Sequence, residues 1–426
     1  MIKQEIIDRI ISDVSIKEVA ENEGITFSSS KGNRHWACCP FHAENTPSFY
    51  VDTGTNCWRC FGKCRSGGNV ISLYRKLKNG IPFPIACKEL AKKYLNEEIE
   101  DEWRPSKEDE EKQKEQDSLR IALSYAQSYF TDCIHEVTPA SVRAREAVRK
   151  RWGEEAIETF GIGYAPRDGF IAWAKLKGLD FDILEQVGLV GQGERGMYAM
   201  LRDRYTIPIY DKMSRVIGFT ARTMSDDKDI CKYLNLKNSL VYHKDESVFG
   251  INFAQKEARL RDKFYLVEGA PDVLKLQSIG ILNTVASLGG AWTANQLKQL
   301  YRVSHRVTFI PDADELKAGN EFPAGTANVF ANGREALAAG FTVNVREIPI
   351  DYPAPKKEDP DSWIVDRGHF SQMREEEFVF WYCRRKYWDS PEDIEELTTE
   401  DRLTAISDIC SLLMMIRDED LQNSYL

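Results

Sequence analysis

The chain has 426 residues, which suggests two or three domains, and its 42% hydrophobic and 11% aromatic residues are enough for folded cores. A wholly disordered chain is therefore excluded, and no apolar run approaches the roughly 18 residues that a membrane span needs. The formal net charge of -10 argues against a nucleic-acid partner, but it is unevenly distributed. Residues 97–117 carry 11 acidic and 4 basic side chains, and residues 389–402 carry 7 and 1, whereas residues 31–78 and 202–244 are basic. The N-terminus lacks the apolar stretch of a signal peptide, so we expect a soluble cytoplasmic protein with no membrane partner.

Half of the ten cysteines fall within residues 38–64, which indicates a metal site rather than a disulfide framework. The expected ligands form two pairs on tight turns, separated by a short hairpin: Cys39 and His42, then Cys60 and Cys64. Three thiolates and one imidazole at this spacing are typical of structural zinc. Cys57 with Cys60 is an alternative second pair that spacing alone does not exclude. We favour the pair that encloses Gly62, because glycine supplies the backbone freedom that a metal knuckle needs.

Aromatic and basic side chains surround these cysteines: Arg34, His35, Trp36, Phe41, Phe49, Tyr50, Trp58, Arg59, Phe61, Lys63 and Arg65. Such interleaving is typical of single-stranded nucleic-acid binding, since bases stack on rings while cations contact phosphates. The alternative for any single ring is that it packs the core of a small zinc domain.

The zinc motif resembles a known family. Three segments carry the resemblance: Cys38-Cys39-Pro40-Phe41-His42, Cys60-Phe61-Gly62-Lys63-Cys64 and Gly67-Gly68-Asn69-Val70-Ile71. They look like the zinc-binding domain of bacterial DnaG-type DNA primases, except that Lys63 is an extra residue in the second pair. The resemblance implies that a zinc-ribbon-like domain, at residues 1–96, contacts the single-stranded template and helps choose where a primer starts.

The acidic stretch at residues 97–117 is expected to be a linker or an exposed helix. Beyond it, residues 118–255 are expected to form a helix from 118 to 150, a turn at 160–166 and a hairpin of strands at 201–211 and 215–222. This region concentrates side chains suited to an incoming triphosphate and a template–primer backbone: Arg202, Arg204, Arg222, Lys232, Tyr233, Asn235 and Lys244. It resembles the basic part of the primase catalytic core, and the alternative is a charged strand face without function.

Strands and helices alternate through residues 256–370, which predicts a parallel sheet with ligands at the carboxyl ends of its strands. Thr293 and Gln296 are spaced as a capping box that opens one of the helices. Acidic side chains follow the predicted strands: Glu268, Asp312, Asp314, Asp359 and Asp361. Converging carboxylates repel one another unless cations neutralise them, and hard oxygen ligands suit Mg²⁺ or Mn²⁺ and hence phosphoryl transfer.

This acidic pattern, including Asp272 three residues after Gly269, resembles the Toprim fold shared by primases, topoisomerases and some nucleases. The resemblance implies that Glu268, Asp312 and Asp314 are catalytic and that all five carboxylates bind magnesium. The sequence departs from the family at Ala313, where a glycine is usual.

Together these features predict an α+β multi-domain protein with a zinc-ribbon-like domain, a mixed α/β primase core containing a Toprim parallel sheet, and a short helical segment at residues 371–426. Helices are expected there at about 372–387 and 402–417. The resemblance implies a DNA primase of the primosome, a DNA-directed RNA polymerase that makes short primers on single-stranded DNA from nucleoside triphosphates by two-metal nucleotidyl transfer.

The resemblance covers residues 1–370. The remaining segment, residues 371–426, is shorter than the family's helicase-docking domain, so we expect a shortened form of the primase. The resemblance therefore leaves open whether a replicative helicase is a partner. Two alternatives remain for the function: a Toprim nuclease or topoisomerase-like enzyme, and a non-catalytic single-strand-binding module.

Overall fold

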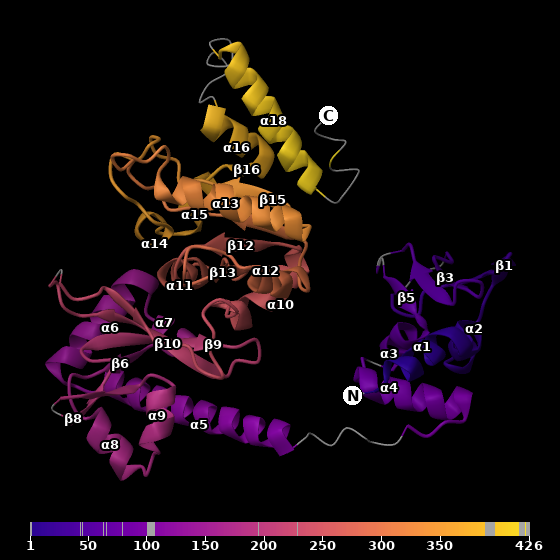
Figure 1. Cartoon of the computed structure of the whole chain (residues 1–426), viewed down its shortest axis with the longest axis horizontal. Helices are drawn as coiled ribbons and strands as arrows, with labels where there is room; N and C mark the ends of the chain where they lie inside the picture. Colours follow the sequence, from indigo (N-terminus) through magenta and orange to yellow (C-terminus); the bar gives the residue numbers. More distant parts are fainter. Residues whose placement is uncertain are drawn as a thin grey trace. The chain divides into compact units, whose positions relative to one another are not determined.

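The computed structural model divides the chain into two compact units, residues 1–111 and 112–426 (Figure 1). The structure describes residues 2–42, 44, 46–62, 64, 66–78, 80–99, 107–194, 196–227, 229–387, 397–416 and 422. Among the helices in these ranges, none has both the length and the apolarity needed to cross a membrane.

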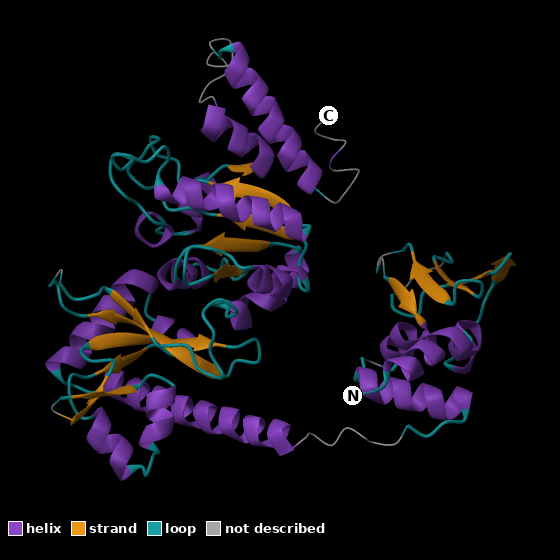
Figure 2. Cartoon of the chain, viewed as in Figure 1, coloured by secondary structure: helices purple, strands orange, loops and turns teal. Residues whose placement is uncertain are grey.

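The first unit packs short helices against an antiparallel sheet in the order β1-β2-β3-β4-β5 (Figure 2). Its strands are β1 (Ser29–Lys31), β2 (Arg34–Ala37), β3 (Phe49–Asp52), β4 (Cys57–Cys60) and β5 (Gly67–Asn69). Its helices are α1 (Gln4–Asp13), α2 (Ile16–Asn22), α3 (Val70–Leu77), α4 (Phe83–Leu90) and the π-helical turn η1 (Ala91–Leu95). Successive strand residues face opposite sides, so Phe49, Val51 and Trp58 enter the core while their neighbours face outward. The predicted hairpin between the two ligand pairs is β3–β4.

The second unit begins within the first turns of helix α5, and its first helices cover a four-stranded antiparallel sheet, β11-β10-β9-β6. The helices are α5 (Lys107–His135), α6 (Pro139–Trp152), α7 (Ala156–Phe160), α8 (Phe170–Leu176) and α9 (Phe181–Gln186). The strands are β6 (Gly163–Ala165), β9 (Arg204–Tyr210), β10 (Val216–Thr223) and β11 (Tyr233–Asn235), and β7 (Val190–Gly193) pairs separately with β8 (Gly196–Ala199). Strands β9 and β10 pair antiparallel at the position of the predicted hairpin, so that prediction is confirmed.

The remainder of this unit is a five-stranded sheet in the order β13-β12-β14-β15-β16, with four parallel strands. The strands are β12 (Phe264–Val267), β13 (Thr284–Ala286), β14 (Arg306–Phe309), β15 (Thr342–Arg346) and β16 (Glu375–Glu377). The helices are α10 (Ile251–Arg261), α11 (Ala270–Ser278), α12 (Ala294–Tyr301), α13 (Ala324–Ala339), α14 (Pro360–Trp363), α15 (Arg367–Gln372), α16 (Phe378–Tyr387) and α18 (Thr399–Met415). The two faces of β12 join different cores: Phe264 and Leu266 pack with α10, α12 and α13, and Val267 packs with α11. The predicted capping box of Thr293 and Gln296 opens α12.

The acidic stretch is expected from the sequence to be a linker or an exposed helix, and from Lys107 onward it is helical, as its Glu, Lys and Gln content favours; residues 100–106 lie outside the described residues. Two other sequence-based expectations differ from the structure. The expected turn at 160–166 contains strand β6, which pairs with β9. The expected helix from residue 372 begins only at Phe378, because Glu375–Glu377 forms β16, antiparallel to β15. The last two helices pack on each other and on the core beneath α13, so this segment belongs to the second unit.

Candidate metal centres and a basic cleft

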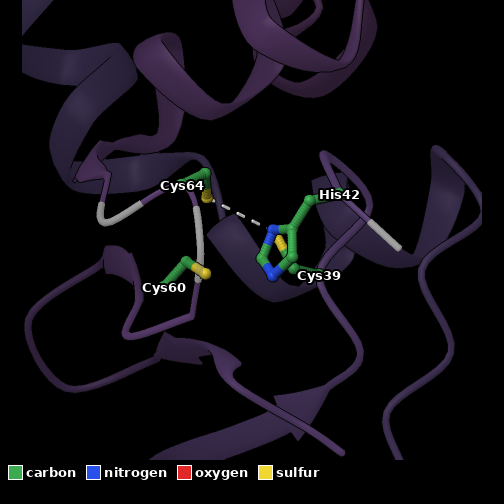
Figure 3. A group of neighbouring side chains, drawn as sticks. All are labelled: Cys39, His42, Cys60 and Cys64. Atoms are coloured by element: carbon green, nitrogen blue, oxygen red, sulfur yellow. Dashed lines mark hydrogen bonds between the residues drawn. The ribbon is translucent and has the colours of Figure 1, made fainter. Parts of the chain in front are cut away.

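The four predicted zinc ligands meet in the first unit (Figure 3). The loop after β2 supplies Cys39 and His42, the end of β4 supplies Cys60, and the turn after β4 supplies Cys64. One potential ligand atom from each residue lies within 4.8 Å of all the others. The Sγ atoms of Cys39 and Cys64 are 3.6 Å apart, close to the roughly 3.8 Å that two thiolates reach on one tetrahedral zinc ion. These residues therefore fit structural zinc.

The alternative ligand Cys57 lies apart from this group. It alternates with Trp58 along β4 and is exposed, whereas Cys60 is buried beside the other ligands. Burial raises the pKa of Cys39 to about 12. Although burial also opposes ionisation of Cys64, hydrogen bonds from Ser66 and from the neighbouring cysteines lower its pKa to about 6, which favours a thiolate ready to bind metal.

Glu44 organises the first ligand loop. Its carboxylate accepts hydrogen bonds from Ser48 Oγ and from the backbone N–H of Cys39, and its Oε2 lies 2.9 Å from Nε2 of His42. The hydrogen bonds from Ser48, with those from Cys39 and His42, lower the pKa of Glu44 to about 2. In this arrangement the other ring nitrogen of His42, Nδ1, would be the metal ligand. A Cβ on Gly62 would lie 2.4 Å from Ser48 Oγ, so the turn needs glycine here for close approach.

Five of the aromatic side chains near the zinc ligands fall into two groups. Phe49 and Trp58 are buried in the core. Trp36, Tyr50 and Phe61 instead form a partly exposed group, which we call the ring platform, with ring centroids 4.9 Å (Trp36–Tyr50) and 5.8 Å (Tyr50–Phe61) apart. Two cations lie over it, Arg34 at 5.0 Å from the Tyr50 centroid and Arg59 at 5.2 Å from that of Phe61. Lys63 and Arg65, also named in the sequence-based prediction, lie outside the described residues.

In the second unit, Glu268, Asp312 and Asp314 follow the carboxyl ends of β12 and β14. Glu268 Oε1 and Asp312 Oδ1 are buried and have no hydrogen-bond partner among the described residues. Burial, and then the nearby Glu268 charge, raises the pKa of Asp312 to about 7; burial also raises the pKa of Glu268. Orphaned, mutually repelling carboxylate oxygens fit a divalent cation. Among the described residues, only the four zinc ligands form a group of three or more potential ligands whose atoms all lie within 4.8 Å of one another. The carboxylate oxygens of Glu268, Asp312 and Asp314 are therefore farther apart than the zinc ligands are.

A lysine that the sequence-based prediction missed lies between two of these carboxylates. Lys357 Nζ is 2.7 Å from Asp312 Oδ2 and 2.7 Å from Asp314 Oδ1. The only sequence signal is the pair of lysines just before Asp359, in a segment with no regular structure.

The two members of the last acidic pair, Asp359 and Asp361, differ in their surroundings. Both oxygens of Asp361 are engaged by protein donors: Oδ1 accepts from Trp152 Nε1 at 2.6 Å, and Oδ2 accepts from the guanidinium of Arg151. The side chain of Asp361 is also only 5% exposed, so the structure disagrees with its predicted role as a metal ligand. Asp359 begins α14, where its Oδ1 accepts the N–H of Ser362 at 2.7 Å.

A cleft of about 1060 Å³ in the second unit has both basic and acidic walls. Arg222 and Lys232 line one part of it, and Asp359 and Asp361 line another. Arg151, Tyr205 and Lys275, which the sequence-based prediction missed, line it as well. The sequence signal for Arg151 is the run Arg149-Lys150-Arg151 at the end of the first predicted helix.

The seven residues predicted to bind nucleotide or template do not form one surface. Tyr233 lies beside the cleft: its hydroxyl is 3.1 Å from Arg151 Nη1 and its ring lies beneath Arg222. Arg204 is a correction to the prediction: it is only 7% exposed and donates to the carbonyls of Ala221 and Lys232, because its position on β9 faces the interior.

The remaining three are spread over other elements. Arg202 is exposed and lies over the ring of Tyr198, and Asn235 ends β11 opposite Thr220. Lys244 lies against the Gly289 loop. None of these three is among the residues that line the cleft described above.

Three domain families match the chain: "CHC2 zinc finger" at residues 2–105, "DNA primase catalytic core, N-terminal domain" at 138–255 and "Toprim-like" at 265–364. The DNA primase of Clostridium acetobutylicum is 33% identical over 374 residues, which are 86% of this chain and 59% of the relative. The DNA primase of Pseudomonas putida is 32% identical over 379 residues, 86% of this chain and 54% of the relative. The chain thus spans somewhat over half the length of these curated relatives.

Solved structures are similar over about three quarters to nearly all of the chain. The zinc-binding and RNA polymerase domains of Aquifex aeolicus primase align with a TM-score of 0.57 and 26% identity, covering 98% of this chain and 94% of that one. A DnaG primase catalytic domain bound to single-stranded DNA aligns with a TM-score of 0.59 and 25% identity, covering 73% and 96%.

Proposed function

The chain belongs to the family of DnaG-type DNA primases, and from this premise we propose that it is a DNA-directed RNA polymerase that makes short primers on a single-stranded DNA template. The observation that supports the proposal best is that basic and acidic groups share one cleft: Arg222 and Lys232 lie in the same cavity as Asp359. A triphosphate needs cationic side chains for its phosphates and carboxylates for the metal ions that accompany it. Of the carboxylates proposed below for the metal site, Asp359 is the one that lines this cleft.

We propose that Glu268, Asp312 and Asp314 hold the catalytic Mg²⁺ or Mn²⁺, with Asp359 at the margin of the site. When bound, such ions neutralise charge on the phosphates and activate the attacking hydroxyl. The chain's own part is to keep these carboxylates at strand ends, partly buried and without competing hydrogen bonds on Glu268 Oε1 and Asp312 Oδ1 among the described residues. Asp361 is left out of this set because Arg151 and Trp152 occupy its oxygens.

Arg222, Lys232 and Tyr233 are proposed to contact the incoming triphosphate or the template–primer backbone, and Arg202, Asn235 and Lys244 to extend that surface. The ring platform of the zinc domain would stack unpaired template bases, with Arg34 and Arg59 placed for phosphates. We keep the boundaries 1–96, 97–117, 118–255, 256–370 and 371–426 as proposed domains. We also propose a cytoplasmic location, where template and nucleoside triphosphates are available. The proposal does not include recruitment by a replicative helicase, which the resemblance leaves open.

The test is incubation of the full chain with single-stranded DNA, labelled ribonucleotides and Mg²⁺ or Mn²⁺. New RNA supports the proposal, a cut template would mean a nuclease, and binding alone would mean a non-catalytic module. Asp312→Asn should abolish synthesis while zinc content is unchanged. The matched control is Asp351→Asn, an exposed residue of the loop between β15 and α14. Full synthesis by the Asp312 variant would refute the assigned site.

A further inference from the structure

A lysine ammonium lies between the two aspartates that follow β14. Lys357 Nζ is 2.7 Å from Asp312 Oδ2 and 2.7 Å from Asp314 Oδ1, so a single charge bridges the Asp-x-Asp pair. The two aspartate side chains are only 10% and 12% exposed. A lysine side chain carries its proton at neutral pH, so an ammonium group is bonded to the oxygens that a cation would use.

Backbone pairing holds the lysine in this place. Residues 313 and 358 form an isolated antiparallel bridge, with Ala313 N donating to Glu358 O at 2.8 Å and Glu358 N donating to Ala313 O at 2.9 Å. The bridge fixes the residue next to Lys357 against the residue between the two aspartates. The N–H of Lys357 also donates to Glu315 Oε1 at 3.2 Å. The side chain remains 53% exposed, so it can turn toward solvent without a change in the backbone.

The remaining oxygens of the site show where a metal ion can enter. Asp314 Oδ2 accepts the N–H of Gly325 at 2.8 Å, so Oδ1, which Lys357 holds, is the oxygen this aspartate can offer to a cation. Asp312 Oδ1 and Glu268 Oε1 have no hydrogen-bond partner among the described residues. A cation that binds Asp314 must replace the ammonium, because two positive charges at contact distance from the same oxygen repel each other strongly in a partly buried site.

We propose that Lys357 is a resident counter-ion of the carboxylate site that competes with divalent metal for Asp312 and Asp314. It neutralises the two charges while metal is absent and weakens the affinity of the site for a divalent cation. This inference rests on the proposed metal site and adds to it a residue that sets the metal concentration at which the site fills.

The test measures Mn²⁺ binding to the zinc-loaded full chain without DNA or nucleotide, by paramagnetic resonance of free Mn²⁺ and by calorimetry. The Asp312→Asn chain gives the background from other sites. Lys357→Gln should bind Mn²⁺ about tenfold more tightly than the unsubstituted chain at low ionic strength, since one opposing charge is gone. Lys357→Arg retains the charge and should keep most of the competition. The matched control is Lys356→Gln, because Lys356 is 83% exposed and pairs with Glu358 at 3.7 Å instead.

Thermal unfolding is a second readout, and it does not require a measured Mn²⁺ affinity. In the zinc-loaded chain without added Mn²⁺ or Mg²⁺, Lys357→Gln should unfold at a lower temperature than Lys356→Gln, because the two aspartates repel each other, and added Mn²⁺ should remove that difference. Equal or weaker Mn²⁺ binding by Lys357→Gln would overturn the inference while leaving the proposed metal site intact. Binding no stronger than the Asp312→Asn background in every chain would overturn both.

Discussion

The guanidinium of Arg151, in the last turn of α6, bonds to the carboxylate of Asp361, in the first turn of α14, with Nε 3.0 Å from Oδ2. The two residues are 210 positions apart in the chain, and the pair joins the helices of the basic part to the acidic end of the parallel sheet. Trp152 donates to the other oxygen of Asp361, and the backbone N–H of Asp361 donates to Asp272. The buried network therefore fixes the relative position of the two walls of the cleft.

Replacing Arg151 by Met should destabilise the second unit by about 3–5 kcal/mol, because it leaves the carboxylate of Asp361 buried and unpaired. Urea unfolding followed by tryptophan fluorescence measures the change. Arg149→Met is the matched control, since Arg149 forms an exposed pair with Glu154 of the kind that contributes at most about 1 kcal/mol.

Asp361→Asn should leave Mn²⁺ affinity near that of the unsubstituted chain, because protein donors occupy both oxygens of Asp361. An affinity as low as that of Asp312→Asn would mean that Asp361 is a metal ligand.

The zinc quartet predicts opposite outcomes for two cysteines that the sequence could not separate. Cys64→Ser should release zinc and unfold the first unit, because a structural zinc ion contributes much of the folding free energy of a small domain. Cys57→Ser should retain zinc, because Cys57 is exposed and lies on the outward side of β4. Metal content by mass spectrometry and thermal unfolding decide between them. Retention of zinc by the Cys64 variant together with loss from the Cys57 variant would reverse the assignment.

The ring platform predicts that Phe61→Ala weakens binding of single-stranded DNA. Phe61 is 57% exposed and lies over Tyr50 and beside Arg59, so its removal should cost about 1–3 kcal/mol, the usual contribution of one stacked base. Fluorescence anisotropy with an unstructured oligonucleotide measures the loss. Phe83→Ala is the control, an exposed phenylalanine at the start of α4 in the same unit. Equal affinities for the two variants would show that the platform does not take bases.

The sequence predicts best where function depends on neighbours along the chain. Each pair of zinc ligands is close together in the chain, so spacing predicts the two pairs, and Gly62 favours Cys64 over Cys57. Glu268 and Asp312 are candidates because each follows a strand whose direction the strand–helix alternation sets. Burial is a tertiary property, and it separates Arg204 from Arg222. The two arginines lie on paired strands, yet one donates to carbonyls inside the sheet and the other lines the cleft.

Partners distant in the chain are not predictable from spacing. Asp361 has the sequence pattern of a metal ligand, but Trp152 and Arg151 reach it from a helix some two hundred residues earlier. The sequence predicts a helix where strand β16 forms, because three consecutive glutamates have a high helix propensity. Its place is set by pairing with β15 and by Lys263 and Asn344, which donate to Glu375.

Asp408 joins the last helix, α18, to α16 through hydrogen bonds. Its Oδ2 accepts hydrogen bonds from Tyr382 at 3.0 Å, from Tyr387 at 2.7 Å and from Lys386, all on α16. The hydrogen bond from Lys386 is the largest of the effects that lower the pKa of Asp408 to about 2. A carboxyl group whose folded pKa is lowered stabilises the fold above its ordinary pKa of 3.8, and that contribution is lost as the pH falls toward about 2.

We therefore expect Asp408→Asn to destabilise the packing of α18 by at most about 2 kcal/mol at neutral pH, since the group is partly exposed and the pKa shift sets the upper limit. Hydrogen exchange of the α18 amides, measured against Ser407→Ala on the same helix, reports the loss locally. The advantage of the unsubstituted chain over the variant should shrink as the pH falls from about 4 toward about 2, because protonated aspartate then resembles asparagine. A difference that stays constant over that range would mean that the ion pair with Lys386 adds no stability and that apolar contacts alone, such as those of Leu412 and Leu413, hold the helix in place.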